Sequence, residues 1–310
     1  MVAAFKPLIG GAPLASGYVP VLLEQTFAGN LSYRAIGATL RSTYNEDSPT
    51  PLGCNFVNFA TGAQAPLTLP VGSTVRAAYL YWAGSGDNAL GQVDADVNFG
   101  VTGSEVPITA DEIFLIEDTG LSNNLDYFTG FKDVTSLVTA SGNYTLKNLT
   151  VQSGAPWNGT QACAGIWGLV AIYDHPDEHL RVVNVFQGFQ PFQNSAFTLV
   201  PRNFRMATND AAQNLPNGQV THITVEGDET LNSPDSKEGL GIQTAPGSTS
   251  YTSIVSSLNP LGQEFNSTVT RPVYVYDAGS GYYVFDNTAG INSDGYEIDV
   301  TQARSSIILQ

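Results

Sequence analysis

The residues most suggestive of chemistry are His175-Pro176-Asp177-Glu178-His179, a polar run between two apolar stretches. Its spacing matches H-x-x-E-H, a zinc-peptidase signature in which two histidines hold the metal and the glutamate acts as the base. That chemistry needs both imidazoles on one face of a helix. Pro176 and the apolar runs on either side instead predict a turn between strands, and only the distant His222 is left as a third imidazole. We therefore expect a polar turn here and no zinc site.

Carboxylates are the second group with chemical potential, because clustered side-chain oxygens are the ligands that Ca²⁺ prefers. Alternation along a predicted strand puts Glu297 and Asp299 on one face. Two interpretations stay open, a calcium site in at least one cluster or solvated acidic loops, and calcium is the one cofactor that the sequence suggests. The candidate clusters are Asp294, Glu297 and Asp299; Asp87, Asp94 and Asp96; and Asp228, Glu229, Asp235 and Glu238.

Aromatic side chains offer a third possibility, a platform on which sugars stack. Alternating aromatic residues in strands are nevertheless more typical of a core or an interface. The residues concerned are Tyr79, Tyr81, Trp82, Trp157, Trp167, Tyr282 and Tyr283.

Enzyme motifs are missing from the sequence. There is no glycine-rich phosphate loop in a strand-helix context and no G-x-S-x-G elbow. Cys163 could act as a nucleophile only beside one of the three histidines. No pair of carboxylates has a spacing that suggests glycoside hydrolysis. The sequence therefore predicts a protein that is not an enzyme.

The two cysteines, Cys54 and Cys163, are either free buried thiols or the ends of one disulfide that closes a long loop. The secreted character of the rest of the chain favours the disulfide. A net charge of −16, with 12 basic residues scattered singly, argues against binding to nucleic acid or to anionic membranes. An acidic surface suits a salty external medium, so we expect a secreted, extracellular or cell-surface protein.

No apolar run is long enough to span a membrane. Residues 1–17 do not make a convincing signal peptide, because Pro7, Gly10, Gly11 and Pro13 interrupt their apolar part. We expect the export signal to be absent from this sequence or its start to be misassigned.

The elements that must position these residues are mostly strands. Residues 165–173 and 180–189 read as two apolar strands that form a central hairpin around the polar turn, and residues 26–43 read as strand, turn and strand. Residues 132–138 are the one candidate helical turn, with Asp133 or Thr135 as its cap. Many strands and frequent turn signals predict an all-β fold: an antiparallel β-sandwich or two packed sandwiches, with long loops and little helix, over residues 26–310.

Residues 1–25 form an apolar N-terminal arm whose only charged residues are Lys6 and Glu24. One interpretation is an ordered first strand after a frayed tail. The other is an arm that docks on a neighbouring subunit by adding a strand to it. The apolar side chains available for this are Phe5, Leu8, Ile9, Leu14, Tyr18, Val19, Val21, Leu22 and Leu23.

Several phrases taken together resemble the N-terminal β domain of large secreted bacterial surface proteins, the adhesin-like class with conserved-repeat modules. They include residues 69–84 (LPVGSTVRAAYLYWAG), 131–138 (FKDVTSLV), 167–173 (WGLVAIY), 264–268 (EFNST) and 295–299 (GYEID). The resemblance covers roughly residues 26–305 and implies an exported, non-enzymatic role at the cell surface or in a matrix. The chain departs from this class by its N-terminal arm and by stopping at residues 305–310, where the similar proteins continue.

These observations predict a structural subunit of an extracellular bacterial filament or matrix fibre, as in a biofilm matrix. Copies of the chain would assemble head to tail, each arm adding a strand to the next subunit. The alternative hypothesis is a monomeric cell-surface adhesin module that binds glycans or another cell, with or without calcium.

Overall fold

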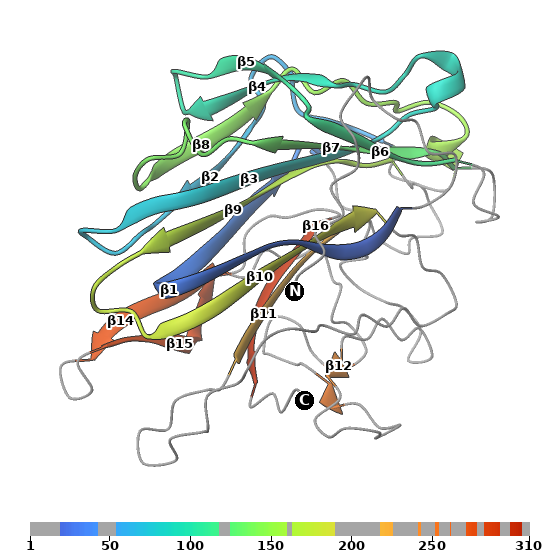
Figure 1. The fold of residues 1–310 in the computed structure, drawn as a ribbon. Helices are drawn as coiled ribbons and strands as arrows, with labels where there is room; N and C mark the ends of the chain where they lie inside the picture. Colours follow the sequence, from blue (N-terminus) through green and yellow to red (C-terminus); the bar gives the residue numbers. More distant parts are fainter. Residues whose placement is uncertain are drawn as a thin grey trace.

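The structure is a computed structural model that describes residues 19–42, 54–117, 125–159 and 163–189, residue 261, and the strands at residues 218–225, 241–242, 252–253, 271–277, 282–291 and 298–305. The described part is all-β and antiparallel, with two sheets packed face to face (Figure 1). Its only helical segments are two 3-10 turns, η1 (Asn88–Leu90) and η2 (Trp157–Gly159). The predicted all-β sandwich is thereby confirmed.

The larger sheet has six strands, and most of them are apolar on both faces. This composition fits their position, because the sheet is covered by other layers on each side. In sheet order the strands are β10 (Leu180–Phe189), β1 (Val19–Thr39), β9 (Gly165–Asp174), β3 (Thr74–Ser85), β7 (Tyr127–Asp133) and β6 (Glu112–Ile116).

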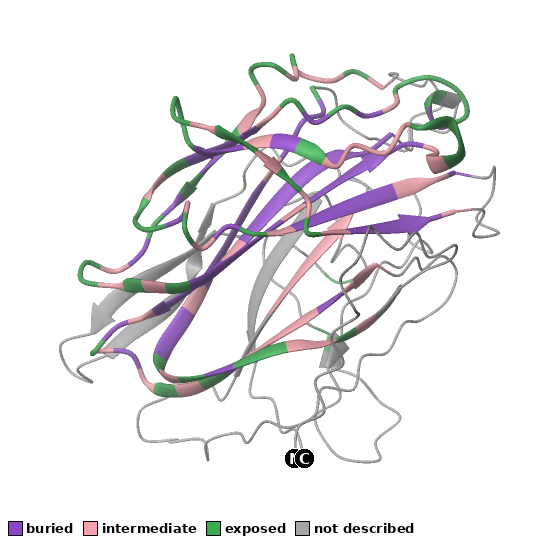
Figure 2. Cartoon of the chain, turned by 45° about the horizontal axis from the view of Figure 1, so that its top comes forward, coloured by how far each residue is buried: buried purple, intermediate pink, exposed green. Residues whose placement is uncertain are grey.

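The smaller sheet has four strands and packs on one face of the larger one. Trp82 and Trp167, both fully buried, fill the space between the sheets. Figure 2 shows the central strands of the larger sheet, β3 and β9, as buried along most of their length. Their indole N–H groups donate to the carbonyls of Asp94 (3.0 Å) and Ala63 (3.1 Å), so neither buried donor is left unpaired. The strands are β2 (Ala63–Leu67), β8 (Gly142–Lys147), β4 (Asp96–Val101) and β5 (Val106–Thr109).

Strand β1 bends in the middle and thereby belongs to two layers (Figure 1). Its second half, from Leu31 to Thr39, pairs with β9, and its first half, from Val19 to Asn30, pairs with β10. Gly29, next to the bend, has φ +150°, a backbone conformation that residues other than glycine rarely adopt.

The first half of β1 and β10 form a two-stranded ribbon, which we call the β1–β10 ribbon. It folds back over the second face of the larger sheet and encloses a separate apolar cluster there. Phe27 and Val183 from the ribbon pack with Tyr79, Phe114 and Phe131 from β3, β6 and β7. A strand that bends in this way lets a sheet cover part of its own face.

Further strands form two-stranded units: β11 (Gly218–Val225) with β16 (Ile298–Ser305), β12 (Gly241–Ile242) with β13 (Thr252–Ser253), and β14 (Arg271–Asp277) with β15 (Tyr282–Ile291). Ile223 and Val225 of β11 pack against Ala35, Ala83 and Ile166 on the same face of the sheet that the ribbon covers.

Two local predictions are wrong. β9 and β10 have the predicted extents but do not form a hairpin, since each pairs with β1. Residues 26–43 contain no turn, because the segment up to Thr39 belongs to one bent strand. The predicted helical turn at residues 132–138 is a hydrogen-bonded turn and not a helix, and its first two residues, Lys132 and Asp133, belong to β7. The Leu137 N–H donates to the Val134 carbonyl (2.8 Å), and the Asp133 side chain accepts from the Thr135 N–H (2.9 Å), as expected of a cap.

Candidate functional site at the β9–β10 corner

The polar run singled out in the sequence is the loop that carries the chain from β9 to β10, opposite the bend in β1. Main-chain bonds fix it: the His175 N–H donates to the Asn30 carbonyl (3.0 Å), and the Glu178 N–H donates to the His175 carbonyl (3.1 Å). The Asn30 side chain also donates to the Glu178 carbonyl (2.8 Å). The segment is therefore a turn, as predicted, and it is held to the middle of β1.

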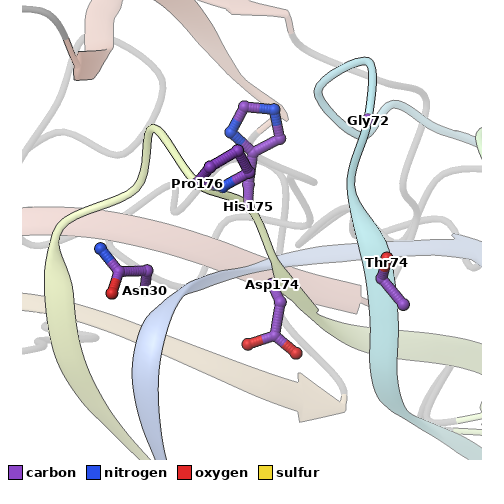
Figure 3. A pocket seen from close by; sticks show the side chains of 6 residues that line it. All are labelled: Asn30, Gly72, Thr74, Asp174, His175 and Pro176. Carbon is purple, nitrogen blue, oxygen red and sulfur yellow. The ribbon is translucent and has the colours of Figure 1, made fainter.

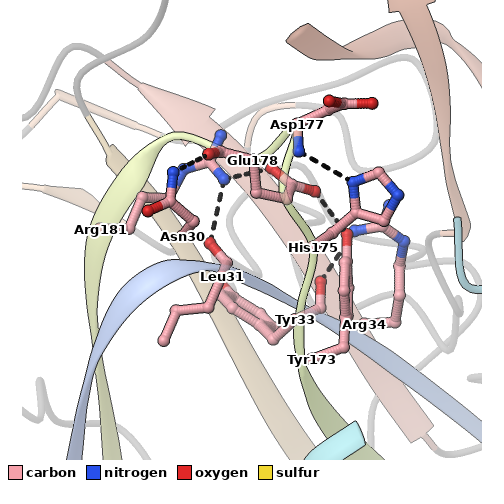
Figure 4. Close-up of polar contacts among 9 residues, drawn as sticks. All are labelled: Asn30, Leu31, Tyr33, Arg34, Tyr173, His175, Asp177, Glu178 and Arg181. Carbon is pink, nitrogen blue, oxygen red and sulfur yellow. Dashed lines mark hydrogen bonds and ion pairs between the residues drawn. The ribbon is translucent and has the colours of Figure 1, made fainter. Parts of the chain in front are cut away.

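Glu178 lies at the centre of what we call the corner cluster, which consists of Asn30, Tyr173, His175, Glu178 and Arg181 (Figure 4). The Glu178 side chain is 1% exposed. Its carboxylate accepts a hydrogen bond from the Tyr173 hydroxyl (2.7 Å) and forms an ion pair with Arg181. Arg181 also donates to the Leu31 carbonyl (3.1 Å). A carboxylate that is removed from water and paired in this way is a structural group, without access for a substrate.

His175 is equally committed. The Asp177 N–H donates to Nδ1 (3.1 Å), so in the neutral ring the proton is on Nε2, which donates to the Val71 carbonyl (3.0 Å). His175 is 5% exposed. The ring ties the β9–β10 loop to the turn that precedes β3, and both its nitrogens are engaged with main-chain groups.

A shallow depression of about 480 Å³ lies beside the corner cluster (Figure 3). Its one carboxylate, Asp174, is bound by Arg76, at 2.8 Å to Nε and 2.7 Å to Nη2. Arg76 also donates to the Ala28 carbonyl (2.9 Å). The depression therefore offers no free acid or base. Its lining residues are Asn30, Gly72, Thr74, Asp174, His175 and Pro176.

The zinc-peptidase geometry is not formed. His175 and Glu178 are engaged with different partners in a turn, where the signature requires one helical face. Within the described ranges, no group of three or more His, Cys, Asp or Glu side chains is arranged to hold a metal ion.

The predicted calcium ligands whose side chains the structure describes each accept hydrogen bonds from protein groups. Asp87 caps η1 by accepting from the Ala89 N–H (2.7 Å). Asp94 accepts from the Thr150 N–H (2.6 Å) and the Asp96 N–H (3.1 Å). Asp96 accepts from the Thr109 hydroxyl. Of the other candidates, Asp299 lies in β16, while Asp294, Glu297, Asp228, Glu229, Asp235 and Glu238 lie outside the described residues.

The cysteines form the disulfide that the sequence favoured. Cys54 and Cys163 are bonded with their Cα atoms 5.8 Å apart, and the bond joins the segment after β1 to the residue pair before β9. Arg41 lies beside it, 2% exposed, with Nη1 donating to the Cys163 carbonyl (2.6 Å) and the guanidinium 5.9 Å from the Phe56 ring.

The predicted assembly arm is only partly described. Val19, Val21, Leu22 and Leu23 belong to β1, and three of them, Val19, Leu22 and Leu23, pair with β10 of the same chain, so the end of the arm is an ordered strand. Leu22 is 62% exposed. Phe5, Leu8, Ile9, Leu14 and Tyr18 lie outside the described residues.

The aromatic candidates are mostly buried. Trp82, Trp157, Trp167 and Tyr79 are all less than 10% exposed, and they pack in the apolar clusters. Tyr81, half-buried, donates to the Gln187 side chain (3.3 Å) across the gap between sheet and ribbon. Tyr282 and Tyr283 lie in β15. The candidates whose side chains are described therefore form core and interlayer contacts rather than an open platform for a sugar ring.

Burial shifts the pKa values of several side chains, among them Tyr79, Tyr81 and His222. Burial, with the charges of Asp133 and Glu24, raises the pKa of Tyr79 to about 12, and burial also raises the pKa of Tyr81. Burial lowers the pKa of His222 to about 4. Its Nδ1 lies 2.9 Å from the Thr224 hydroxyl. All three shifts favour the neutral form and are properties of a packed interior.

The arginines at the corner are the site residues that sequence reasoning missed. Arg76 and Arg181 pair with carboxylates, and the Arg34 guanidinium lies 5.1 Å from the centre of the Tyr173 ring. A signal existed: each is an isolated charge inside an apolar strand of a chain with few basic residues. Such a charge is tolerated in a core only with a partner.

The chain is thus a β-sandwich protein, and the side chains of its corner cluster bind one another and the main chain. Residues 21–227 match the family described as "Protein of unknown function (DUF3344)", and the chain belongs to this family. The match covers β1 to β11, and thus both sheets, the ribbon and the corner. No curated protein and no solved structure matches the chain. No helix in the described ranges has the length and apolar character needed to cross a bilayer.

Proposed function

We propose that this chain is a structural subunit of an extracellular filament or matrix fibre, which assembles head to tail by strand addition through its N-terminal arm. The observation that carries the proposal is where the arm joins the fold. β1 begins at Val19, opposite Phe189, so the apolar segment before it continues from the end of a two-stranded ribbon. A segment placed there can extend to a second molecule and pair with it through main-chain bonds.

The character of the fold supports this role. A disulfide and an acidic, lysine-poor composition suit the oxidising exterior of a cell. The polar groups at the corner serve to hold layers together, which suits a protein whose task is mechanical. Strand addition suits such a task, because its main-chain bonds are independent of side-chain identity while the alternating side chains set the register.

Removing the arm tests the proposal. A variant lacking residues 1–18 keeps β1 whole and is compared with full-length protein by electron microscopy and sedimentation. A matched control replaces residues 1–18 with a Gly/Ser segment of the same length, which preserves chain length and removes the apolar side chains. We expect fibres from the full-length chain alone and folded monomers from the two variants.

Two outcomes would overturn the proposal. Fibres of normal length and yield from both variants would show that the arm is not the assembly element. A full-length chain that stays monomeric and binds a glycan tightly, in an array screened with and without chelator, would favour the alternative of an adhesin module.

A further inference from the structure

The edges of the two sheets differ in how well they are protected against pairing with another chain. The smaller sheet ends in β2 and β5, and each of these strands contains a proline, Pro66 and Pro107. A proline lacks the N–H that an added strand would use, so it protects an edge. The smaller sheet is therefore a poor acceptor.

The larger sheet ends in β6 and β10, and these two edges also differ. β6 has five residues, and its last four are buried. β10 has ten residues, contains no proline, and carries Arg181 as its one charge, which is paired with Glu178. Among the described residues, only β1 pairs with β10. β10 is thus the one long edge strand without a proline in the described part of the sandwich. Its C-terminal part contacts β6, where the Gln187 side chain donates to Glu112 (3.3 Å), so the N-terminal part of β10 is the open part of this edge.

β10 also exposes apolar side chains. Leu180 is 79% exposed and Val182 is 43% exposed, and alternation along a strand places both on one face. Their partners across the ribbon, Asn30 and Ala28, are uncharged and exposed as well. An uncharged strip of this kind on a chain of net charge −16 is a surface at which like copies can meet without opposing carboxylates.

The segment best suited to this edge is the N-terminal arm. Residues 1–18 contain Lys6 and no carboxylate, so the negative charge of the chain lies outside them. Their apolar side chains can cover Leu180 and Val182. The arm is thus complementary to the acidic body in charge and to the exposed strip of β10 in polarity.

Geometry favours the arm of a second copy. The arm leaves the ribbon at the end where Val19 faces Phe189, and the exposed strip begins at the other end, where Asn30 faces Leu180. A ten-residue strand spans about 33 Å, so an arm in the same molecule would have to reverse and run back along the ribbon. An arm from a neighbour can reach the strip directly. Donor and acceptor at opposite ends of one ribbon give a heterologous contact, which repeats into a fibre.

We propose that the outer edge of β10 is the acceptor for the N-terminal arm of the next subunit, which adds a strand there and covers Leu180 and Val182. This inference rests on the proposed function, since it names the surface that strand addition uses.

Photocrosslinking tests the acceptor directly. Phe5 is replaced by p-benzoylphenylalanine, and fibres are assembled from equal amounts of ¹⁴N- and ¹⁵N-labelled full-length protein, irradiated and mapped by mass spectrometry. We expect crosslinks between unlike isotopes that end in residues 180–189. Crosslinks that join only peptides of the same isotope would mean that the arm pairs within its own molecule, and this result would overturn the inference. Crosslinks between unlike isotopes that end in β5 or β6 would mean that another edge is the acceptor. That result would also overturn the inference, but it would leave the proposed function standing. Absence of fibres would overturn both.

Surface variants give an independent measurement. Leu180→Glu and Val182→Glu should each raise the critical concentration for fibre assembly about tenfold or more, because a buried apolar contact is lost and a carboxylate would have to be buried. The matched controls are Val71→Glu (94% exposed), in the turn before β3, and Leu90→Glu (69% exposed), in η1, which add the same charge away from β10. The thermal midpoint of each monomer confirms folding. Equal effects in all four variants, or none in the β10 variants, would overturn the inference.

Discussion

At the scale of single residues, the polar groups that the sequence offered as catalytic are committed to holding the chain in place. Glu178 lies between Tyr173 and Arg181, and His175 joins two loops through both ring nitrogens. The H-x-x-E-H spacing was therefore a coincidence of composition within a turn. The residues themselves were correctly singled out as unusual, because a glutamate and a histidine between two apolar strands become buried and then need partners.

Replacing Arg181 by methionine should reveal the cost of the unpaired Glu178 carboxylate. We expect the free energy of unfolding to fall by about 3–5 kcal/mol, because a buried charge loses its partner. Arg76→Met is the matched control. Its ion pair with Asp174 involves side chains that are 37% and 34% exposed, and such a pair is worth about 1 kcal/mol or less. Urea denaturation measures both values, and similar losses in the two variants would contradict the structural role of Glu178.

His222 should make stability depend on pH. Its pKa in the folded protein is about 4, against an ordinary value of 6.5, so the folded state stays neutral while the unfolded chain takes up a proton as the pH falls below 6.5. The free energy of unfolding should therefore decrease as the pH falls from 6.5 to 4, and the contribution of His222 should be fully present above pH 6.5. We expect His222→Gln to remove this part of the slope, measured by urea denaturation at pH 7, 6 and 5. Equal slopes in both proteins would rule out a buried neutral His222.

At the scale of elements, the strands were predictable and their partners were not. The extents of β9 and β10 follow from their long apolar runs, and β3 follows from the same signal. The hairpin prediction was wrong because a short loop between two strands normally joins neighbours. Here β1 is long enough to pair with both, and the loop turns the corner together with β1. Pairing of this kind depends on a segment more than a hundred residues away.

The contact between β7 and β3 gives a prediction at this scale. Gly130 lies opposite Trp82, and a Cβ at Gly130 would be 2.2 Å from Cε2 of that fully buried ring. Gly130→Ala should therefore destabilise the protein by about 1–3 kcal/mol through overpacking. Gly142→Ala in β8 is the control, since its nearest neighbour would be Tyr144 Cε2 at 3.8 Å, an ordinary contact. The free energies of unfolding of the two variants, measured by urea denaturation, test this prediction. A Gly130→Ala variant as stable as the wild type would mean that the Trp82 ring does not lie against Gly130.

At the scale of the whole molecule, the described fold has three layers: the smaller sheet, the larger sheet, and the β1–β10 ribbon that continues from the larger sheet through the bend in β1. One disulfide ties the segment after β1 to the segment before β9. The disulfide spans a sequence separation of 109 residues. A cross-link over a loop of this length removes much of the freedom of the unfolded chain.

Removal of the disulfide should lower stability without abolishing the fold. For the double variant Cys54→Ala and Cys163→Ala we expect a loss of about 4–5 kcal/mol, the chain-entropy value for a loop of this length. Urea denaturation of the variant and of the oxidised wild type measures the difference. Wild type treated with reductant in urea should match the variant, and an unchanged midpoint in both would show that the bond contributes nothing.

The sequence by itself determined the all-β class, the positions of the main strands, the cysteine pair and the unusual polar run, because alternation, β-branched runs and turn residues act locally. Tertiary structure alone decided that β1 bends between two layers, that β10 is an edge, and that Arg76, Arg181 and Arg34 meet their partners at the corner. These features depend on pairing between segments that are distant in the sequence, and a local sequence pattern specifies neither the partner strand nor the register of such pairing. The polar run is therefore the turn that the sequence predicts, and the tertiary structure adds that this turn is the corner at which the ribbon folds back over its sheet.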